Sequence, residues 1–140
     1  MRNEIFVLDA SVIVKWFSNE TNSEKAREIR DMFVNGDILI VCPDLILYEI
    51  TNALRYANAL NENDVKDAVE SLYNIEIDII VPTKEVMRKS IEFAKEFNIT
   101  VYDAVYISLS EILNVKLVTA DEKLIRACKN HDYIISLTKF

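Results

Sequence analysis

The stretch Glu4-Ile5-Phe6-Val7-Leu8-Asp9-Ala10-Ser11 decides how this chain can fold. Its mostly apolar first part ends at a carboxylate, and a short apolar run with polar ends is typical of a strand buried on both faces. Four further runs of this kind predict strands at 38–42, 77–81, 116–119 and 133–135. The chain is therefore expected to contain five short strands.

Helical patterns occupy the sequence between these runs. In 23–34 and 85–97, apolar residues recur at three- and four-residue spacing, as in an amphipathic helix. Further helices are predicted at 45–60, 64–73, 101–113 and 122–129. Buried strands that alternate with helices form a parallel sheet covered on both sides. The predicted fold class is α/β, a three-layer α/β/α sandwich with a five-stranded parallel sheet.

Asparagine is expected to replace glycine at the helix ends. The chain has a single glycine, Gly36, although glycine most readily adopts the left-handed conformation that ends many helices. Asparagine is the next best residue for that conformation. The asparagines expected to end helices are Asn35, Asn74, Asn98, Asn114 and Asn130.

The composition limits the possible classes of protein. A chain of 140 residues, 51% of them hydrophobic, fits one domain spanning 1–140. Its net charge of −7 argues against binding nucleic acid by bulk positive charge, so any such contact must be local. A single glycine excludes the dinucleotide fingerprint and the P-loop. The amino terminus lacks the apolar core of a secretory signal, and no apolar run approaches the roughly 20 residues of a membrane span. We therefore expect a cytoplasmic protein with no membrane partner.

The cysteines and the histidine do not form a recognisable metal motif. Cys42 and Cys128 are isolated from each other, and His131 lies near only the second of them. Two potential ligands are too few for a zinc site, and a disulfide is not expected in a reducing compartment. We expect both cysteines to be small core residues and His131 to lie at the surface.

Three acidic residues lie near the predicted strand ends. Asp9 closes the first strand, Asp121 follows the strand at 116–119, and Asp103 begins the helix that leads into that strand. Ligands of open parallel sheets bind at the carboxyl ends of the strands. These three acids are therefore candidate site residues.

A fourth acid, Glu49, lies on a mostly apolar helix face. Its neighbours at helical spacing include Leu45, Ala53 and Tyr56, together with the polar Asn52. A carboxylate on such a face is costly unless a cation or hydrogen-bond donors satisfy it. We expect Glu49 to be buried and to meet a positive group.

Two interpretations of these acids remain open. Asp9 can cap a helix that starts at Ala10, and Thr100 with Asp103, or Thr119 with Glu122, fits the capping-box pattern. Alternatively, the acids cluster, in which case their mutual repulsion is relieved by divalent cations. Oxygen ligands without histidine or thiolate favour Mg²⁺ or Mn²⁺ over Zn²⁺.

Four motifs together resemble the PIN-domain ribonucleases and, within that family, the VapC-type toxins of toxin–antitoxin pairs. The motifs occupy 7–17, 43–54, 102–106 and 117–124, and an acidic residue, Glu20, follows the first. The four acids follow one another in the family's order and range of intervals. The resemblance implies the strand order 3-2-1-4-5. That order independently makes physical sense, because it places the strands before Asp9 and Asp121 side by side at the topological switch point.

The resemblance also implies roles for particular residues. The implied metal ligands and catalytic residues are Asp9, Glu49, Asp103 and Asp121. Ser11 and Thr119 are implied as supporting hydroxyls and Asn52 as a secondary polar contact. Residues that can contact RNA phosphates near such a site, or simply be solvated surface charges, are Lys15, Arg55, Lys123 and Arg126. The chain departs from the family pattern at Asn114, Ser108 and Ser110, which affects local packing and removes no carboxylate.

The function implied by the resemblance is an Mg²⁺- or Mn²⁺-dependent endoribonuclease that hydrolyses RNA phosphodiester bonds as a type II toxin. A homodimer and a cognate antitoxin are the implied partners. Aromatic residues that can supply a partner surface, or belong to the core instead, are Trp16, Phe17, Tyr48 and Tyr56. The alternatives are a housekeeping RNA-processing PIN nuclease and a non-catalytic interaction domain. Phosphotransfer is disfavoured, because Ile80-Val81-Pro82 and Ser11 stand where receiver and haloacid-dehalogenase domains need aspartates.

Overall fold

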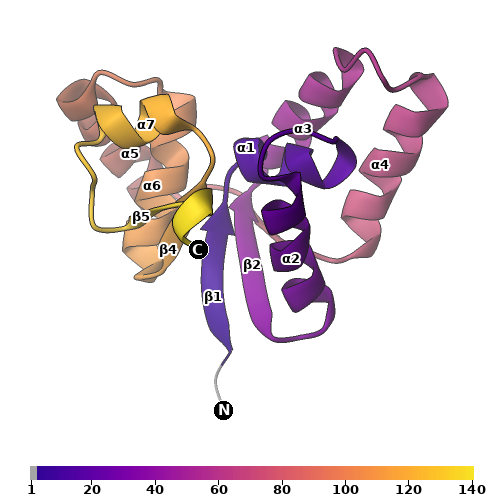
Figure 1. Cartoon of the computed structure of the whole chain (residues 1–140). Coiled ribbons are helices and arrows are strands. Elements are labelled where there is room, and N and C mark those ends of the chain that lie inside the picture. Colours follow the sequence, from indigo (N-terminus) through magenta and orange to yellow (C-terminus); the bar gives the residue numbers. More distant parts are fainter. Residues whose placement is uncertain (1–2) are drawn as a thin grey trace.

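Five parallel strands form the centre of the computed structural model, which describes residues 3–140 (Figure 1). The strands are β1 (Glu4–Leu8), β2 (Ile38–Pro43), β3 (Asp78–Ile80), β4 (Lys116–Thr119) and β5 (Ile134–Ser136). They lie in the order β3-β2-β1-β4-β5, and each neighbouring pair is parallel. The predicted α/β class and strand order are confirmed.

Helices cover both sides of this sheet. They are α1 (Ala10–Ile13), α2 (Ser23–Val34), α3 (Leu45–Arg55), α4 (Glu62–Asn74), α5 (Lys84–Phe97), α6 (Val101–Leu113) and α7 (Glu122–Ala127), with 3₁₀ turns at Val14–Phe17 and Leu137–Lys139. α5, α6 and α7 lie on one side and α2, α3 and α4 on the other (Figure 1). Within residues 3–140, none of the helices combines the length and apolar character needed to cross a bilayer.

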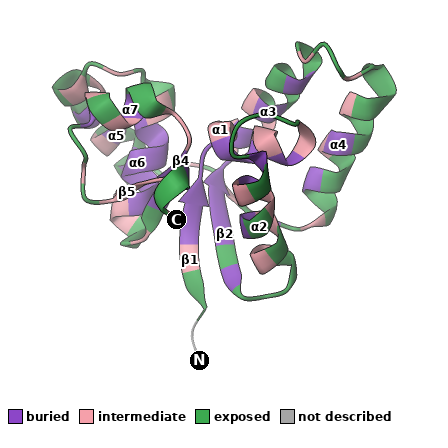
Figure 2. Ribbon diagram, viewed as in Figure 1, coloured by how far each residue is buried: buried purple, intermediate pink, exposed green. Residues whose placement is uncertain are grey.

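The core is concentrated on the central strands and on α6. Val7 in β1 pairs with Val41 of β2 on one side and Leu117 of β4 on the other, and Val7 and Leu117 have no exposed surface. Most of α6 is also buried, because it packs on β1, β2 and β4 (Figure 2). The carboxyl ends of β1 and β4 are therefore held by the best-packed part of the molecule.

One helix boundary differs clearly from the sequence prediction. α3 ends at Arg55 instead of continuing to residue 60. A new helix begins after Asn61, whose side chain accepts a hydrogen bond of 2.8 Å from the Asp64 N–H while the Asp64 carboxylate accepts one of 3.0 Å from the Asn61 N–H. This reciprocal capping box starts α4 earlier than its apolar pattern indicates.

Two asparagines end helices in the left-handed region as predicted, Asn98 after α5 and Asn114 after α6, with φ values of 53° and 55°. Asn130 also has a positive φ of 55°, but it lies beyond the end of α7, whose cap is Cys128. The prediction is wrong for Asn35, whose φ is −77°, and for Asn74, which lies inside α4. Positive φ falls instead on Gly36 and Glu76, each one or two residues farther along.

The structure corrects the prediction for His131 and decides between the two alternatives for Trp16. His131 is not a simple surface residue, because its side chain is 21% exposed and its ring packs edge-on against Phe93 and Phe97. Trp16 belongs to the core, where its indole N–H donates to the Ala26 carbonyl at 2.9 Å. Both cysteines are free thiols in the interior, as expected.

Candidate active site

Asp9 lies at the carboxyl end of β1 and also caps α1. Its Oδ1 accepts hydrogen bonds from the Ser11 N–H at 3.1 Å and from the Ser11 hydroxyl at 2.5 Å. Its Oδ2 accepts one from the Thr119 hydroxyl at 2.5 Å. Thr119 reaches Asp9 because it ends β4, the neighbour of β1 in the sheet. The capping interpretation of Asp9 is therefore correct, but it describes only part of its environment.

The electrostatic surroundings of Asp9 are unfavourable for a charge. The pKa of Asp9 is raised from 3.8 to about 6. Burial is the largest cause and the charges of Asp121 and Glu49 add to it, whereas the hydrogen bonds from Ser11 and Thr119 oppose it. The side chain is only 7% exposed. Asp9 is thus a rigidly held carboxylate whose charged form a nearby cation would stabilise.

The two hydroxyl groups also fix the turn that follows β4. The Ser11 Oγ accepts a hydrogen bond of 2.8 Å from the Ala120 N–H, and the Thr119 Oγ1 accepts one of 3.1 Å from the Asp121 N–H. Each hydroxyl therefore contacts Asp9 and the backbone of the turn that carries Asp121. This arrangement couples the positions of two candidate acids.

Asp121 and Asp103 lie at the starts of two helices, Asp121 as the cap of α7 and Asp103 in the first turn of α6. The Asp121 carboxylate caps α7 by accepting hydrogen bonds from the Lys123 and Leu124 N–H groups, at 3.0 and 3.1 Å. In α6, Thr100 is the cap, and its hydroxyl oxygen accepts from the Asp103 N–H at 3.1 Å. Burial and the charge of Asp121 raise the pKa of Asp103, so its carboxylate lies within electrostatic reach of Asp121.

Glu49, in α3, is half-buried and is satisfied by a neutral donor. The Tyr106 hydroxyl in α6 donates to its Oε1 at 2.5 Å. Among residues 3–140 it forms no ion pair, so the expected positive group is not supplied by the described part of the chain. Burial and the charge of Asp103 raise the pKa of Glu49, while the Tyr106 hydrogen bond lowers it.

Each of the four acids has at least two of the others as electrostatic neighbours. Asp9 is influenced by Asp121 and Glu49, and Asp103 influences Glu49 and is itself influenced by Asp121. They come from four separate segments of the chain, at the β1 end, α3, α6 and the turn after β4. We call these residues the acidic quartet.

The donor chemistry of the acidic quartet suits a hard divalent cation. Cys42 lies close enough to Asp9 for its thiol pKa to be raised, but burial raises that pKa to about 12 and the thiol donates to the Leu8 carbonyl. The potential ligands are therefore carboxylate oxygens, which Mg²⁺ and Mn²⁺ prefer. In residues 3–140 no three His, Cys, Asp or Glu side chains are arranged so that they could hold a metal ion, so ligation requires side-chain adjustment.

The polar and basic candidates differ in accessibility. Asn52, Arg55, Lys123 and Arg126 are exposed. Lys15 is different, because its side chain is 13% exposed and its ammonium group donates to Glu20 and to the Thr21 carbonyl, both at 2.9 Å. Lys15 therefore has little surface left for a phosphate.

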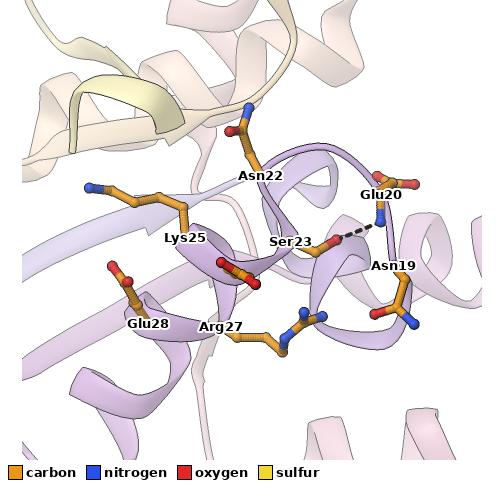
Figure 3. Close-up of a pocket in the computed structure, with 8 residues that line it drawn as sticks. Asn19, Glu20, Asn22, Ser23, Lys25, Arg27 and Glu28 are labelled. Atoms are coloured by element: carbon orange, nitrogen blue, oxygen red, sulfur yellow. Dashed lines mark hydrogen bonds between the residues drawn. The ribbon is translucent and has the colours of Figure 1, made fainter.

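Two surface hollows lie near these residues. One of about 590 Å³ at the start of α2 is lined by polar and charged side chains of residues 19–28, and the Glu20 N–H donates to the Ser23 hydroxyl there (Figure 3). It contains none of the candidate site residues. Another, of about 560 Å³, is lined by residues of α3 and α4 and includes Asn52, Arg55 and the exposed rings of Tyr48 and Tyr73.

Sequence reasoning missed Tyr106 as a partner of Glu49. The available signal was its position three residues after Asp103, which places both on one face of α6. The contact to α3 is not encoded in any local pattern, because the two partners are 57 positions apart.

Comparison with known proteins agrees with this fold. The model of the PIN domain matches residues 6–130. The chain is 31% identical over 122 residues to Ribonuclease VapC3 of Pyrobaculum aerophilum, covering 84% of this chain and 90% of that protein. The crystal structure of PAE2754 from Pyrobaculum aerophilum superposes with a TM-score of 0.70 at 19% identity, covering 96% of this chain and 90% of the other. A toxin–antitoxin complex from Klebsiella pneumoniae contains a chain with a TM-score of 0.72 at 10% identity, with coverage of 96% and 98%. From the extent of the domain match and the similarity to Ribonuclease VapC3, we conclude that this chain belongs to the PIN-domain family.

Proposed function

We propose that this protein is a metal-dependent endoribonuclease that hydrolyses RNA phosphodiester bonds. The observation that carries the proposal is the acidic quartet, four carboxylates from separate segments that lie within electrostatic reach of one another at the carboxyl end of the sheet. Membership of the PIN-domain family and the similarity to a VapC ribonuclease support RNA as the substrate.

The proposed ligands of Mg²⁺ or Mn²⁺ are Asp9, Asp103 and Asp121, with Glu49 as a further ligand or as the group that orients the attacking water. A bound divalent cation supplies a water of lowered pKa and neutralises charge on the phosphate. The role of Ser11 and Thr119 is to hold the Asp9 carboxylate in one orientation through their hydroxyl groups.

Contacts to the RNA backbone are proposed for basic side chains beside the acidic quartet. Lys123 and Arg126 are exposed on α7, directly after Asp121, and Arg55 is exposed on α3, beyond Glu49. Local positive charge of this kind allows a chain with a net charge of −7 to bind an anionic strand. Asn52, one helical turn from Glu49, is a proposed polar contact at the same edge.

We further propose that the protein acts in the cytoplasm as the toxin of a type II pair, as a homodimer held inactive by an antitoxin. The shared fold with a chain of a toxin–antitoxin complex supports this assignment. The exposed rings of Tyr48, Tyr56 and Tyr73 are candidates for a protein interface, whereas Trp16 is excluded from such a role by its burial.

Incubation of the purified protein with end-labelled RNA tests the proposal. Cleavage is expected with Mg²⁺ or Mn²⁺, to give 5′-phosphate and 3′-hydroxyl ends, and is expected to stop in excess EDTA. Asp9→Asn should be folded and nearly inactive, because the amide keeps the shape of the carboxylate without its charge. Undiminished cleavage in EDTA would contradict the metal-dependent mechanism.

A separate experiment distinguishes a toxin from a housekeeping nuclease. Induced expression of the wild-type protein in a host without an antitoxin should arrest growth, and expression of Asp9→Asn should not. Normal growth with active soluble enzyme would favour the RNA-processing alternative.

A further inference from the structure

A buried tyrosine hydroxyl forms the contact that holds Glu49. Tyr106 is 2% exposed, and its hydroxyl donates to Glu49 Oε1 at 2.5 Å, linking α6 to α3. No second hydrogen bond to the Glu49 carboxylate is present within residues 3–140. The orientation of this carboxylate therefore depends on a single donor.

The carboxylates of Asp9 and Asp121 are held more firmly than that of Glu49. Asp9 accepts three hydrogen bonds, and Asp121 accepts two from backbone N–H groups. Glutamate also has one more rotatable bond than aspartate, so more conformations must be restricted. Loss of the Tyr106 hydroxyl would consequently free Glu49 more than loss of any one donor would free Asp9.

Tyr106 also lies where it can act on the site without touching a substrate. It is one helical turn after Asp103 on α6, and its hydroxyl reaches across to Glu49 on α3. Its side chain belongs to the hydrophobic core. The hydroxyl thus approaches the site from the protein side and not from the solvent side.

We propose that Tyr106 is a positioning residue whose hydroxyl holds Glu49 Oε1, so that Oε2 is the oxygen presented to the cation or to the attacking water. This inference rests on the proposed function, because it assigns Glu49 a role in that reaction. Residues that orient a metal ligand typically contribute about 10- to 100-fold to metal affinity or activity.

Tyr106→Phe tests the role of the hydroxyl, since it keeps the buried ring. Tyr133→Phe is the matched control, because it removes a tyrosine hydroxyl that donates to Asn114 at 2.8 Å. Asn114 precedes β4 and Tyr133 precedes β5, so this contact lies at the amino ends of the strands, away from the acidic quartet. Thermal unfolding first establishes that each variant is folded. Should Tyr106→Phe not fold, Tyr106→Met takes its place, because methionine also removes the hydroxyl and fills the buried space with a flexible apolar side chain.

The first measurement is binding of Mn²⁺ alone, followed by electron paramagnetic resonance of the free ion. Tyr106→Phe, or Tyr106→Met in its place, should weaken binding about 10-fold, while Tyr133→Phe binds like wild type. Tyr106→Phe should have little further effect in a Glu49→Gln protein, because the hydroxyl acts through Glu49. Full additivity of the two substitutions, or wild-type binding by Tyr106→Phe, would overturn the proposal.

The second measurement is RNA cleavage by the same proteins. Tyr106→Phe should lower kcat about 10- to 100-fold with KM within about twofold, since the hydroxyl does not touch RNA. A protein that binds Mn²⁺ but cleaves no RNA would refute the proposed function, and the binding comparison would still decide the role of Tyr106. Absence of Mn²⁺ binding by wild type would refute both.

Discussion

Thr119 and Asp9 are 110 positions apart in the sequence, and the Thr119 hydroxyl donates a hydrogen bond of 2.5 Å to Asp9 Oδ2. The contact exists because β1 and β4 are neighbours in the sheet and both end at this point. The same Thr119 oxygen accepts a hydrogen bond from the Asp121 N–H. One hydroxyl thus ties together the two strand ends that carry Asp9 and Asp121.

Thr119→Val should destabilise the protein by about 1–3 kcal/mol, because it preserves the shape of the side chain but leaves a buried carboxylate oxygen and a backbone N–H without their partner. Urea unfolding measures the change in the free energy of unfolding. Thr119→Ser is the control, since it keeps the hydroxyl and should lose less stability than Thr119→Val. Equal losses in the two variants would mean that the hydroxyl contributes nothing beyond packing.

The location of this contact follows from the sequence, whereas its atomic detail does not. Short apolar runs and the helices between them predict a parallel sheet, and ligand sites of such sheets lie at the strand ends where Asp9 and Asp121 occur. The resemblance to the PIN-domain family adds Glu49 and Asp103 to the set. The spatial convergence of the four acids required the packing of α3 and α6 on the sheet, which no local pattern specifies.

Several errors of prediction have the same physical origin. Glu49 is met by Tyr106, and His131 is enclosed by Phe93 and Phe97, so both depend on contacts between segments far apart in the sequence. The left-handed residue expected at Asn35 and Asn74 is found instead at Gly36 and Glu76, although α2 and α4 end close to where they were predicted to end.

The stability of the metal-free protein should depend on pH through Asp9. Its pKa in the folded state is raised from 3.8 to about 6, so the folded protein holds this proton more tightly than the unfolded chain does. The stabilisation is present below about pH 4 and is lost as the pH rises to about 6, a change of about 3 kcal/mol. The raised pKa values of Glu49 and Asp103 act in the same direction.

Comparison with Asp9→Asn isolates this contribution from the other acids. Chemical unfolding of both metal-free proteins between about pH 4 and pH 7 should show the variant gaining stability relative to wild type as the pH rises. A constant difference across this range would indicate that Asp9 titrates as an ordinary, solvated aspartate.

Lys123→Ala should weaken the binding of RNA without lowering kcat, because a phosphate contact on exposed α7 contributes to association and not to the chemical step. The slope of log Kd against log salt concentration should fall by about one, the amount expected for the loss of one phosphate contact. Lys66→Ala is the matched control, since Lys66 is an exposed lysine on α4 that pairs with Glu62. Identical behaviour of the two variants would remove α7 from the proposed RNA path.

Mg²⁺ should stabilise wild type far more than Asp9→Asn, which separates a shared metal site from a purely structural role of the acids. A cation that binds only the folded chain, at about 100 times its dissociation constant, adds roughly 2.7 kcal/mol to the free energy of unfolding. Asp9→Asn lacks one ligand charge, so its affinity for Mg²⁺ and its gain in stability should both be much smaller.

Without metal at neutral pH, Asp9→Asn should instead be the more stable of the two proteins. The amide removes the cost of a buried charge near Asp121 and Glu49 and still caps α1. Thermal scans of both proteins with and without Mg²⁺ test both statements, and four superimposable curves would show that these carboxylates do not share a metal site.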